Sequence, residues 1–209
     1  MNKRIKTSIQ MIADYDNEYS KFFDVAVEGS MPVLATRSLV LFPGIISPIL
    51  IGRKQSLSLL KYVNKLEDPI FTVFCQKDNN VEKPEEKDLY RYGVYARLMK
   101  VIDMPGPGNN VTAIVQAMGR CELRKITRLT PYIVGDVAPA REDKPEADDE
   151  EFKTASEDLK TSAFNYIRDN EDLPDEAKLA LENIHNDVIA LNFVCTNLPF
   201  NVADKIELL

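Results

Sequence analysis

In the stretch Leu41-Phe-Pro-Gly-Ile-Ile-Ser-Pro-Ile-Leu-Ile-Gly-Arg-Lys-Gln-Ser56, two prolines and two glycines interrupt an apolar run. Proline fixes φ and donates no backbone hydrogen bond, so Pro43 and Pro48 exclude the centre of a paired sheet. Gly44 and Gly52 are expected to supply the unusual dihedrals of a corner. The stretch therefore predicts an edge strand or the bent rim of a barrel, with helical spacing after Gly52.

The flanking sequence is mainly strand-like as far as residue 140. Short apolar runs beside turn residues predict strands at residues 31–35, 45–51, 70–76 and 132–138. Residues 53–66 instead show apolar positions three and four apart, which predict one inserted helix. Five or six short strands with one helix are typical of a small, partly closed barrel, because closure leaves few exposed edges.

A β-hairpin is predicted from two alternating arms, residues 92–104 and 111–120, on either side of six turn-forming residues. Gly119 falls inside the second arm and predicts a bulge or a close backbone approach. The even spacing of each arm places its apolar side chains on one sheet face: Val94, Ala96, Leu98, Ile102 and Met104 in the first arm, and Val111, Ala113, Val115 and Ala117 in the second.

Charge divides the chain near residue 140. The net charge of −7 combines −1 across residues 1–30, +5 across residues 31–140 and −11 across residues 141–209. We expect four regions: a flexible tail at 1–30 with a short helix around 8–14, a β-rich barrel at 31–140, an acidic linker at 141–151 and a helical subdomain at 152–209. Like charges repel one another and gain little from packing, so the linker is expected to be solvated.

Helical spacing returns after the linker. Apolar residues three and four apart predict an amphipathic helix from Phe152 to Tyr166, and Pro174 is expected in the first turn of another. Residues 188–194 are apolar nearly all round, which predicts the buried centre of a small bundle. A last helix is expected to begin near Asn201. The predicted fold class is therefore α+β.

Several classes of function find no support in the sequence. No apolar run is long enough for a transmembrane helix, and the N-terminal residues lack the apolar core of a secretory signal. Cys75, Cys121 and Cys195 lie far apart in apolar segments, which favours buried free thiols in a reducing cytoplasm over a disulfide or a metal site. No phosphate-binding glycine motif is present, and His185 has a sequence context typical of a turn or cap.

The opening stretch resembles the N-terminal domain of the Lon protease family (endopeptidase La). The resemblance is carried by Leu34-Ala-Thr-Arg37, Phe42-Pro-Gly44, Pro48 with the apolar run after it, Gly52-Arg53 and Ser56, then by Asp88-Leu-Tyr-Arg-Tyr-Gly-Val94 and Leu198-Pro-Phe-Asn-Val-Ala-Asp-Lys-Ile-Glu-Leu-Leu209. In that family the last of these precedes a long helix and an ATPase module, so the chain is expected to be a fragment of something larger. The resemblance also implies a PUA-like pseudo-barrel before the helical subdomain.

The resemblance implies a non-catalytic domain that recognises unfolded or degron-bearing proteins for an ATP-dependent serine protease and assists hexamer assembly in the cytoplasm. It implies no catalytic residue, cofactor or metal in this chain, with ATP and magnesium bound by the parent protein's ATPase. The expected partners are unfolded or damaged proteins, the rest of the Lon polypeptide and further copies of it, with no membrane. We expect weak apolar capture of substrates by loop residues Leu41, Phe42, Ile45, Ile46 and Met104.

Two alternatives stay open. One is a stand-alone Lon-domain binding or adaptor protein. The other is a PUA-like RNA-binding module, suggested by the basic residues Arg120, Arg124, Lys125 and Arg128. These four residues lack the interleaved aromatic side chains that stack on bases. A solvated strand face, or a seam with the acidic helices, is the preferred interpretation of this cluster.

Overall fold

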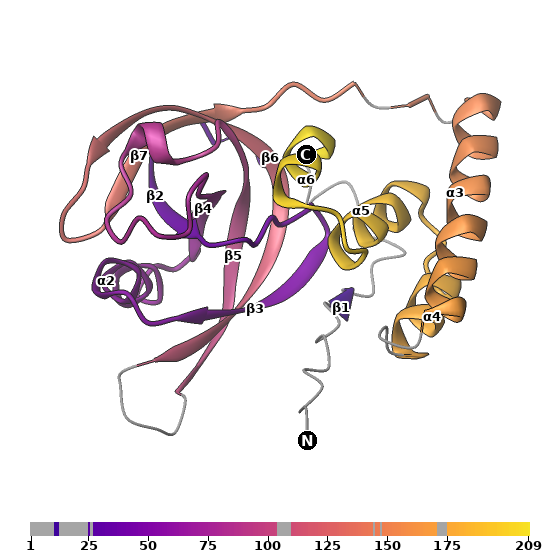
Figure 1. Cartoon of the computed structure of the whole chain (residues 1–209). Coiled ribbons are helices and arrows are strands. Elements are labelled where there is room, and N and C mark those ends of the chain that lie inside the picture. Colours follow the sequence, from indigo (N-terminus) through magenta and orange to yellow (C-terminus); the bar gives the residue numbers. More distant parts are fainter. Residues whose placement is uncertain are drawn as a thin grey trace, which may run out of the picture.

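The computed structural model describes residues 11–12, 25, 27–103, 110–143, 145–146, 148–170 and 175–209, and it places a β-rich barrel beside a group of helices (Figure 1). The strands are β1 (Met11–Ile12), β2 (Gly29–Thr36), β3 (Ile45–Ile51), β4 (Ile70–Cys75), β5 (Tyr92–Asp103), β6 (Val111–Arg128) and β7 (Ile133–Pro139). The helices are α2 (Lys54–Val63), a short 3₁₀ turn η1 (Glu86–Asp88), α3 (Glu150–Asp169), α4 (Asp175–Glu182), α5 (Asp187–Asn197) and α6 (Val202–Leu208).

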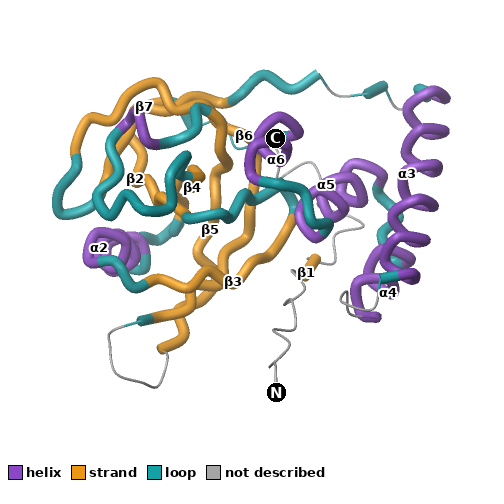
Figure 2. Tube along the Cα trace, in the orientation of Figure 1, coloured by secondary structure: helices purple, strands orange, loops and turns teal. Residues whose placement is uncertain are grey.

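The sheet closes on itself through its longest strand. The strand order is β1-β3-β6-β5-β4-β2-β7, and β6 also pairs with β7, which completes a circuit of β6, β5, β4, β2 and β7. β2 and β4 are parallel, and the other pairs are antiparallel. The barrel and α2 lie on one side of the molecule and α3 and α4 on the other, with α5 between them (Figure 2). The predicted small barrel with one inserted helix, followed by a helical part, is confirmed.

The hairpin of β5 and β6 is also confirmed, although its turn lies outside the described residues and β6 continues well past residue 120. The bulge predicted at Gly119 is present. Val94 pairs with Arg120 and Ala96 with Ala117, so Met118 and Gly119 together lie opposite Tyr95 alone. An extra residue in one strand bends the strand and increases its twist, which favours barrel closure.

A second bulge corrects one prediction about the hairpin. Leu98 pairs with Val115 and Lys100 with Ile114, so Met99 is an extra residue in β5. Because sheet faces alternate strictly, one extra residue turns the rest of the strand over. Ile102 therefore lies on the outer face and is exposed, rather than sharing the inner face with Val94.

The proline-broken stretch forms the rim of the barrel. Pro48 lies in β3 opposite Ile114 of β6, and among the described residues no strand pairs with Pro48 on its other side. This is the edge position that its missing N–H predicts. Gly44 has a φ of +83°, as expected for a corner. Gly52 does not have a positive φ, and the prediction of an unusual dihedral there is wrong; the carboxamide of Asn110 instead occupies the space that a Cβ would need.

The core has two parts that meet at this rim. The barrel interior is filled by apolar side chains of its strands and of α2, such as Leu59, Leu60 and Val63. A separate cluster joins α3, α4 and α5 to rim residues of the barrel. α5 lies between the barrel and α3 (Figure 1), and six of its residues are buried, as its apolar sequence predicts. Asn201 caps α6 through its side chain.

The N-terminal region differs from the prediction of a tail as far as residue 30. Met11 and Ile12 pair with Ile46 and Ile45 as β1, where a short helix was expected. Closer to the barrel, the carbonyl of Val27 accepts a hydrogen bond from the buried Tyr95 hydroxyl at 2.5 Å. The position predicted for Pro174 lies outside the described residues. Because strand pairing depends on a distant partner, no local pattern in residues 8–14 indicates it.

Candidate functional site

An open groove of about 550 Å³ lies along β3. Both inward-facing residues, such as Ile49, and outward-facing ones, such as Leu50, line it. Because successive residues of a strand point to opposite faces, a cavity lined by both runs along the strand edge. The opposite wall comes from the end of β2 and the residues after it, including Arg37 and Leu39.

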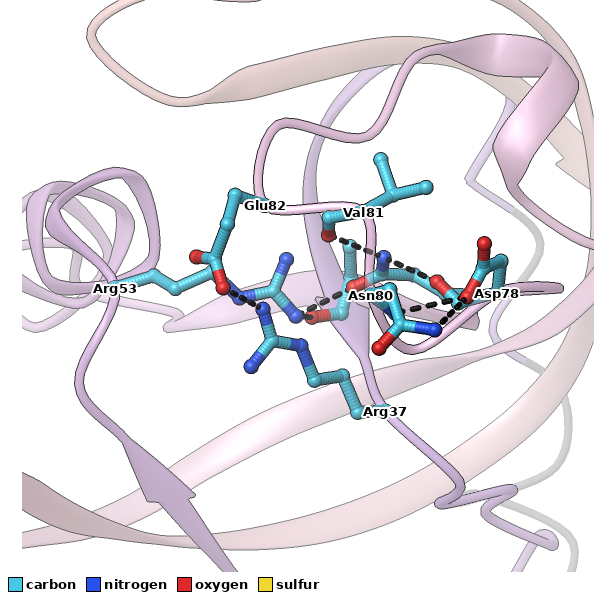
Figure 3. A network of polar contacts seen from close by, with 8 residues as sticks. Arg37, Arg53, Asp78, Asn80, Val81 and Glu82 are labelled. Carbon is cyan, nitrogen blue, oxygen red and sulfur yellow. Dashed lines mark hydrogen bonds and ion pairs between the residues drawn. The ribbon is translucent and has the colours of Figure 1, made fainter.

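Three charged side chains line this groove: Arg37, Arg53 and Glu82. Arg37 Nη2 lies 2.6 Å from Glu82 Oε1, and Arg53 Nη2 donates to the carbonyl of Ala35 at 3.3 Å. Figure 3 shows the two guanidinium groups side by side, with Glu82 reaching over to Arg37. Burial lowers the pKa of the Arg53 guanidinium and Arg37 lowers it further, whereas Glu82 raises it.

Buried Gln76 fixes the loop that carries Glu82. Its Oε1 accepts a hydrogen bond from Arg53 at 2.5 Å, and its Nε2 donates to the carbonyls of Asp78 and Val81 at 3.2 and 2.9 Å. Asp78 in turn accepts from the backbone N–H of Asn80 at 2.8 Å (Figure 3), a local turn typical of Asp. The barrel core thus positions an otherwise exposed loop beside the groove.

An apolar surface adjoins the groove on the outer face of β3, β6 and β5. Leu50 pairs with Thr112 and Thr112 with Ile102, so the three side chains form one row across the sheet. The exposed fractions of Leu50 and Ile102 are 67% and 42%. The next row consists of Pro48, Ile114 and Lys100. We call these two rows the outer face.

The structure corrects the predicted capture residues. Leu41, Phe42 and Ile45 are buried, with exposed fractions of 2%, 0% and 0%, so they are not an exposed surface. Leu41 packs in the barrel core, whereas Phe42 and Ile45 belong to the cluster shared with α3, α4 and α5. Ile46 is half-buried and Met104 lies outside the described residues. Packing against the helices explains the apolar character of Phe42 and Ile45, and packing in the barrel core explains that of Leu41.

No sequence pattern identifies the residues that line the groove as a site. Gly52-Arg53 forms part of the family motif, and Leu50 lies within an apolar run. The only feature of the sequence that indicates a special position for Arg53 is that a helix is predicted to start there, directly after the edge strand. No sequence signal marked Glu82, because its position beside Arg53 depends on the hydrogen bonds by which Gln76 joins Arg53 to Val81.

The basic residues of β6 do not form one surface. Arg120 turns into the seam with the helices and pairs with Glu142 at 3.0 Å. Arg124 pairs with Glu28 at 2.5 Å, and Arg128 lies over the ring of Tyr132. The seam that was the preferred interpretation is confirmed for Arg120.

The other singled-out residues lie apart from the groove. Cys75 and Cys121 are buried, Cys195 is half-buried, and all three are free thiols. His185 is exposed in the loop between α4 and α5, which is the predicted turn. In the part of the chain that the structure describes, no group of His, Cys, Asp and Glu side chains is arranged to hold a metal ion. No helix there combines the length and apolarity needed to cross a membrane.

Comparisons with known proteins agree on one family. Residues 30–209 match the model of the ATP-dependent protease La (LON) substrate-binding domain. The chain is 33% identical over 180 residues to a Lon protease of Flavobacterium johnsoniae, and 31% identical over 196 residues to one of Parabacteroides distasonis. These alignments cover 86% and 94% of the chain but only 22% and 23% of the relatives. The chain therefore spans about a fifth of their length.

A solved structure shows the same fold. The N-terminal domain of a Lon protease of the Mycobacterium avium complex superimposes with a TM-score of 0.61 at 13% sequence identity. The alignment covers 86% of this chain and 95% of that domain. The barrel-and-helix architecture is thus common to both chains at low sequence identity.

Proposed function

Because the chain belongs to the family of ATP-dependent protease La (Lon) substrate-binding domains, we propose that it binds unfolded or degron-bearing proteins for a Lon-type protease. In this proposal the domain carries no catalytic chemistry. ATP, magnesium and the proteolytic residues belong to other parts of a longer cytoplasmic polypeptide. Assembly into a hexamer would present several copies of the domain, so that weak contacts with one substrate gain avidity.

The outer face carries the proposal. Leu50 and Ile102 are exposed apolar side chains in one cross-strand row, and Pro48 and Ile114 continue the surface. Apolar patches on protein surfaces commonly mark interaction sites. Burial of apolar area gains roughly 25 cal/mol per Å² without directional requirements, so such a surface favours weak capture that tolerates many sequences. This suits partners whose apolar side chains are exposed by unfolding.

The RNA-binding alternative has less support. Arg120 and Arg124, the two basic residues of β6 with ionic partners, are paired with Glu142 and Glu28. A phosphate-binding surface needs cations that stay available to the backbone of the nucleic acid. The pairing favours a role in holding the domain together.

The test is binding of the chain to a reduced, amidomethylated protein that cannot refold, measured by fluorescence anisotropy. Leu50→Ser and Ile102→Ser should each weaken binding about threefold to tenfold, because each removes apolar area from the contact. Leu179→Ser is the matched control, since Leu179 has an exposed fraction of 61% on α4, away from the outer face. Equal effects of all three substitutions, or none, would remove the outer face as the capture surface.

A further inference from the structure

The groove beside β3 combines three features, of which the outer face supplies only the apolar surface. Beyond Ile46, β3 pairs only with β6 among the described residues, which leave the other edge of positions 48–51 unpaired. Leu39 and Leu50 supply apolar walls. Arg37 and Arg53 supply two positive charges against the single negative charge of Glu82. The groove therefore offers backbone edge, apolar surface and excess positive charge together.

The geometry points to an extended polypeptide segment that carries a carboxylate next to an apolar side chain. We propose that the groove binds such a segment along the β3 edge, with its carboxylate at Arg37 and Arg53. This inference rests on the proposed function and narrows the substrate class. Adding a strand to an exposed sheet edge is a common mode of peptide recognition, in which pockets for side chains provide specificity.

The two arginines suit a carboxylate for a structural reason. The guanidinium of Arg53 is held at Nη2 by Gln76 and Ala35, so its orientation is fixed before any ligand binds. Arg37 is an exposed residue after β2, and it forms an ion pair with the carboxylate of Glu82. Planar guanidinium groups bind carboxylates through paired hydrogen bonds. α2 has no acidic residue in its first turn, so it brings no carboxylate to this wall.

Glu82 occupies the position that a ligand carboxylate would take. Its side chain has an exposed fraction of 73%, and an ion pair so open to water contributes little stability. A carboxylate that also gains contacts with Leu39, Leu50 and the β3 edge can displace it. Glu82 therefore acts as an internal competitor, and its removal should favour the ligand.

Pro48 limits how much chain the edge can take. It has no N–H, so pairing along β3 lacks one donor and is restricted to a short segment. Edge prolines of this kind discourage open-ended sheet growth. Recognition of a few residues near a carboxylate is compatible with this restriction, whereas a long added strand is not.

Three labelled peptides test the proposal on the 209-residue chain: Gly-Val-Leu-Leu with a free C-terminal carboxylate, the same peptide as its amide, and Gly-Val-Leu-Asp-Gly as its amide. We expect at least one of the two carboxylate peptides to bind about threefold to tenfold more tightly than the neutral peptide. The tighter of the two identifies the C-terminal or the side-chain carboxylate as the recognised group. Equal binding of all three peptides would overturn the proposal.

Substitutions locate the site. Arg37→Ala should abolish the preference for a carboxylate, and Glu82→Gln should increase affinity for the carboxylate peptides about threefold. Arg141→Ala and Asp143→Asn are matched controls, because this exposed pair gives the same changes of charge outside the groove. If the control at Arg141 weakens binding as much as Arg37→Ala, net charge is responsible and the groove is not the site.

The same measurements separate this proposal from the one on which it rests. If the unfolded protein binds and depends on Leu50 and Ile102, but the peptides show no carboxylate preference, only the groove proposal fails. If neither the unfolded protein nor any peptide binds, both proposals fail. Circular dichroism spectra of Arg37→Ala and Glu82→Gln check that the fold is intact, which is expected because both side chains are exposed.

Discussion

Arg120 of β6 and Asn192 of α5 connect the barrel to the helices through a buried amide. Arg120 Nη2 donates to Asn192 Oδ1 at 3.2 Å, and Asn192 Nδ2 donates to the carbonyl of Pro43 at 2.9 Å. The same guanidinium reaches Glu142 of the linker and the backbone oxygen of Leu209. One arginine thus joins a barrel strand, the rim loop, the linker and the end of α6. The relative placement of barrel and helices depends on this network as well as on apolar packing.

Replacing Asn192 by Ala should destabilise the protein by about 1–3 kcal/mol, because the buried carbonyl of Pro43 and one N–H of Arg120 lose their partner. Urea denaturation measures the change in the free energy of unfolding. Asn183→Ala is the control, since Asn183 is exposed and a substitution there should stay within about 0.5 kcal/mol. Equal effects of the two substitutions would mean that the bridge contributes nothing.

Replacing Phe42 by Ala should cost about 3–5 kcal/mol of folding stability, because its side chain is fully buried against the helices. The affinity of the remaining folded protein for unfolded substrates should be unchanged. Leu50→Ser should show the opposite behaviour, with weaker binding and nearly normal stability, since Leu50 is exposed. Thermal unfolding and anisotropy on the same samples distinguish the two. A folded Phe42→Ala variant with lost affinity would restore the loop as a capture surface.

Two glycines of the barrel should respond differently to alanine. A Cβ at Gly93 would lie 2.3 Å from the carbonyl oxygen of Val73, and backbone has little room to move. A Cβ at Gly135 would first meet Leu123 Cδ1 at 2.6 Å, the far end of a flexible side chain. We expect Gly93→Ala to lower the free energy of unfolding by more than about 2 kcal/mol and Gly135→Ala by less. The reverse order in urea denaturation would contradict the tight approach of β5 to β4.

The fold should lose stability at alkaline pH. Burial raises the pKa of the Cys121 thiol and of the Tyr95 phenol well above their ordinary values of 9.0 and 10.0. Both groups ionise more readily in the unfolded chain, so their contribution is fully present below pH 9 and is lost as the pH rises beyond it. The urea concentration at which half of the protein is unfolded should therefore decrease as the pH is raised above about 9. Cys121→Ala should flatten this decline relative to its own value at pH 7, and an unchanged slope would contradict it.

Local patterns predicted the elements that depend on neighbours in sequence. The alternation of residues 111–117 gave a buried strand face, and Gly119 gave the bulge that is observed. The apolar stretch 188–194 gave a buried helix for the same reason, since its composition leaves no polar face. Ile102 was placed on the wrong face because the extra residue at Met99 leaves no mark in the sequence.

The candidate site was harder to predict than the fold. Phe42 and Ile45 looked like exposed loop residues because their apolar partners on α3, α4 and α5 lie more than a hundred residues further along the chain. Leu41 is buried in the barrel core instead. Arg37, Arg53 and Glu82 come from three separate segments and meet only because Gln76 bonds to two of those segments. These three segments come together only when the barrel strands that carry them are paired.

Proline, glycine and apolar periodicity act on the backbone within a few residues, so the barrel rim, the inserted helix and the hairpin could be predicted from the sequence, and the motifs indicated the family. Long-range packing sets which apolar residues remain exposed and which charges meet in the groove. Exposure is a property of what packs against a side chain, and for Phe42 and Leu50 that is set by chain closure over long distances. Two similar apolar residues in one short stretch therefore have opposite roles, one in the core and one on the surface.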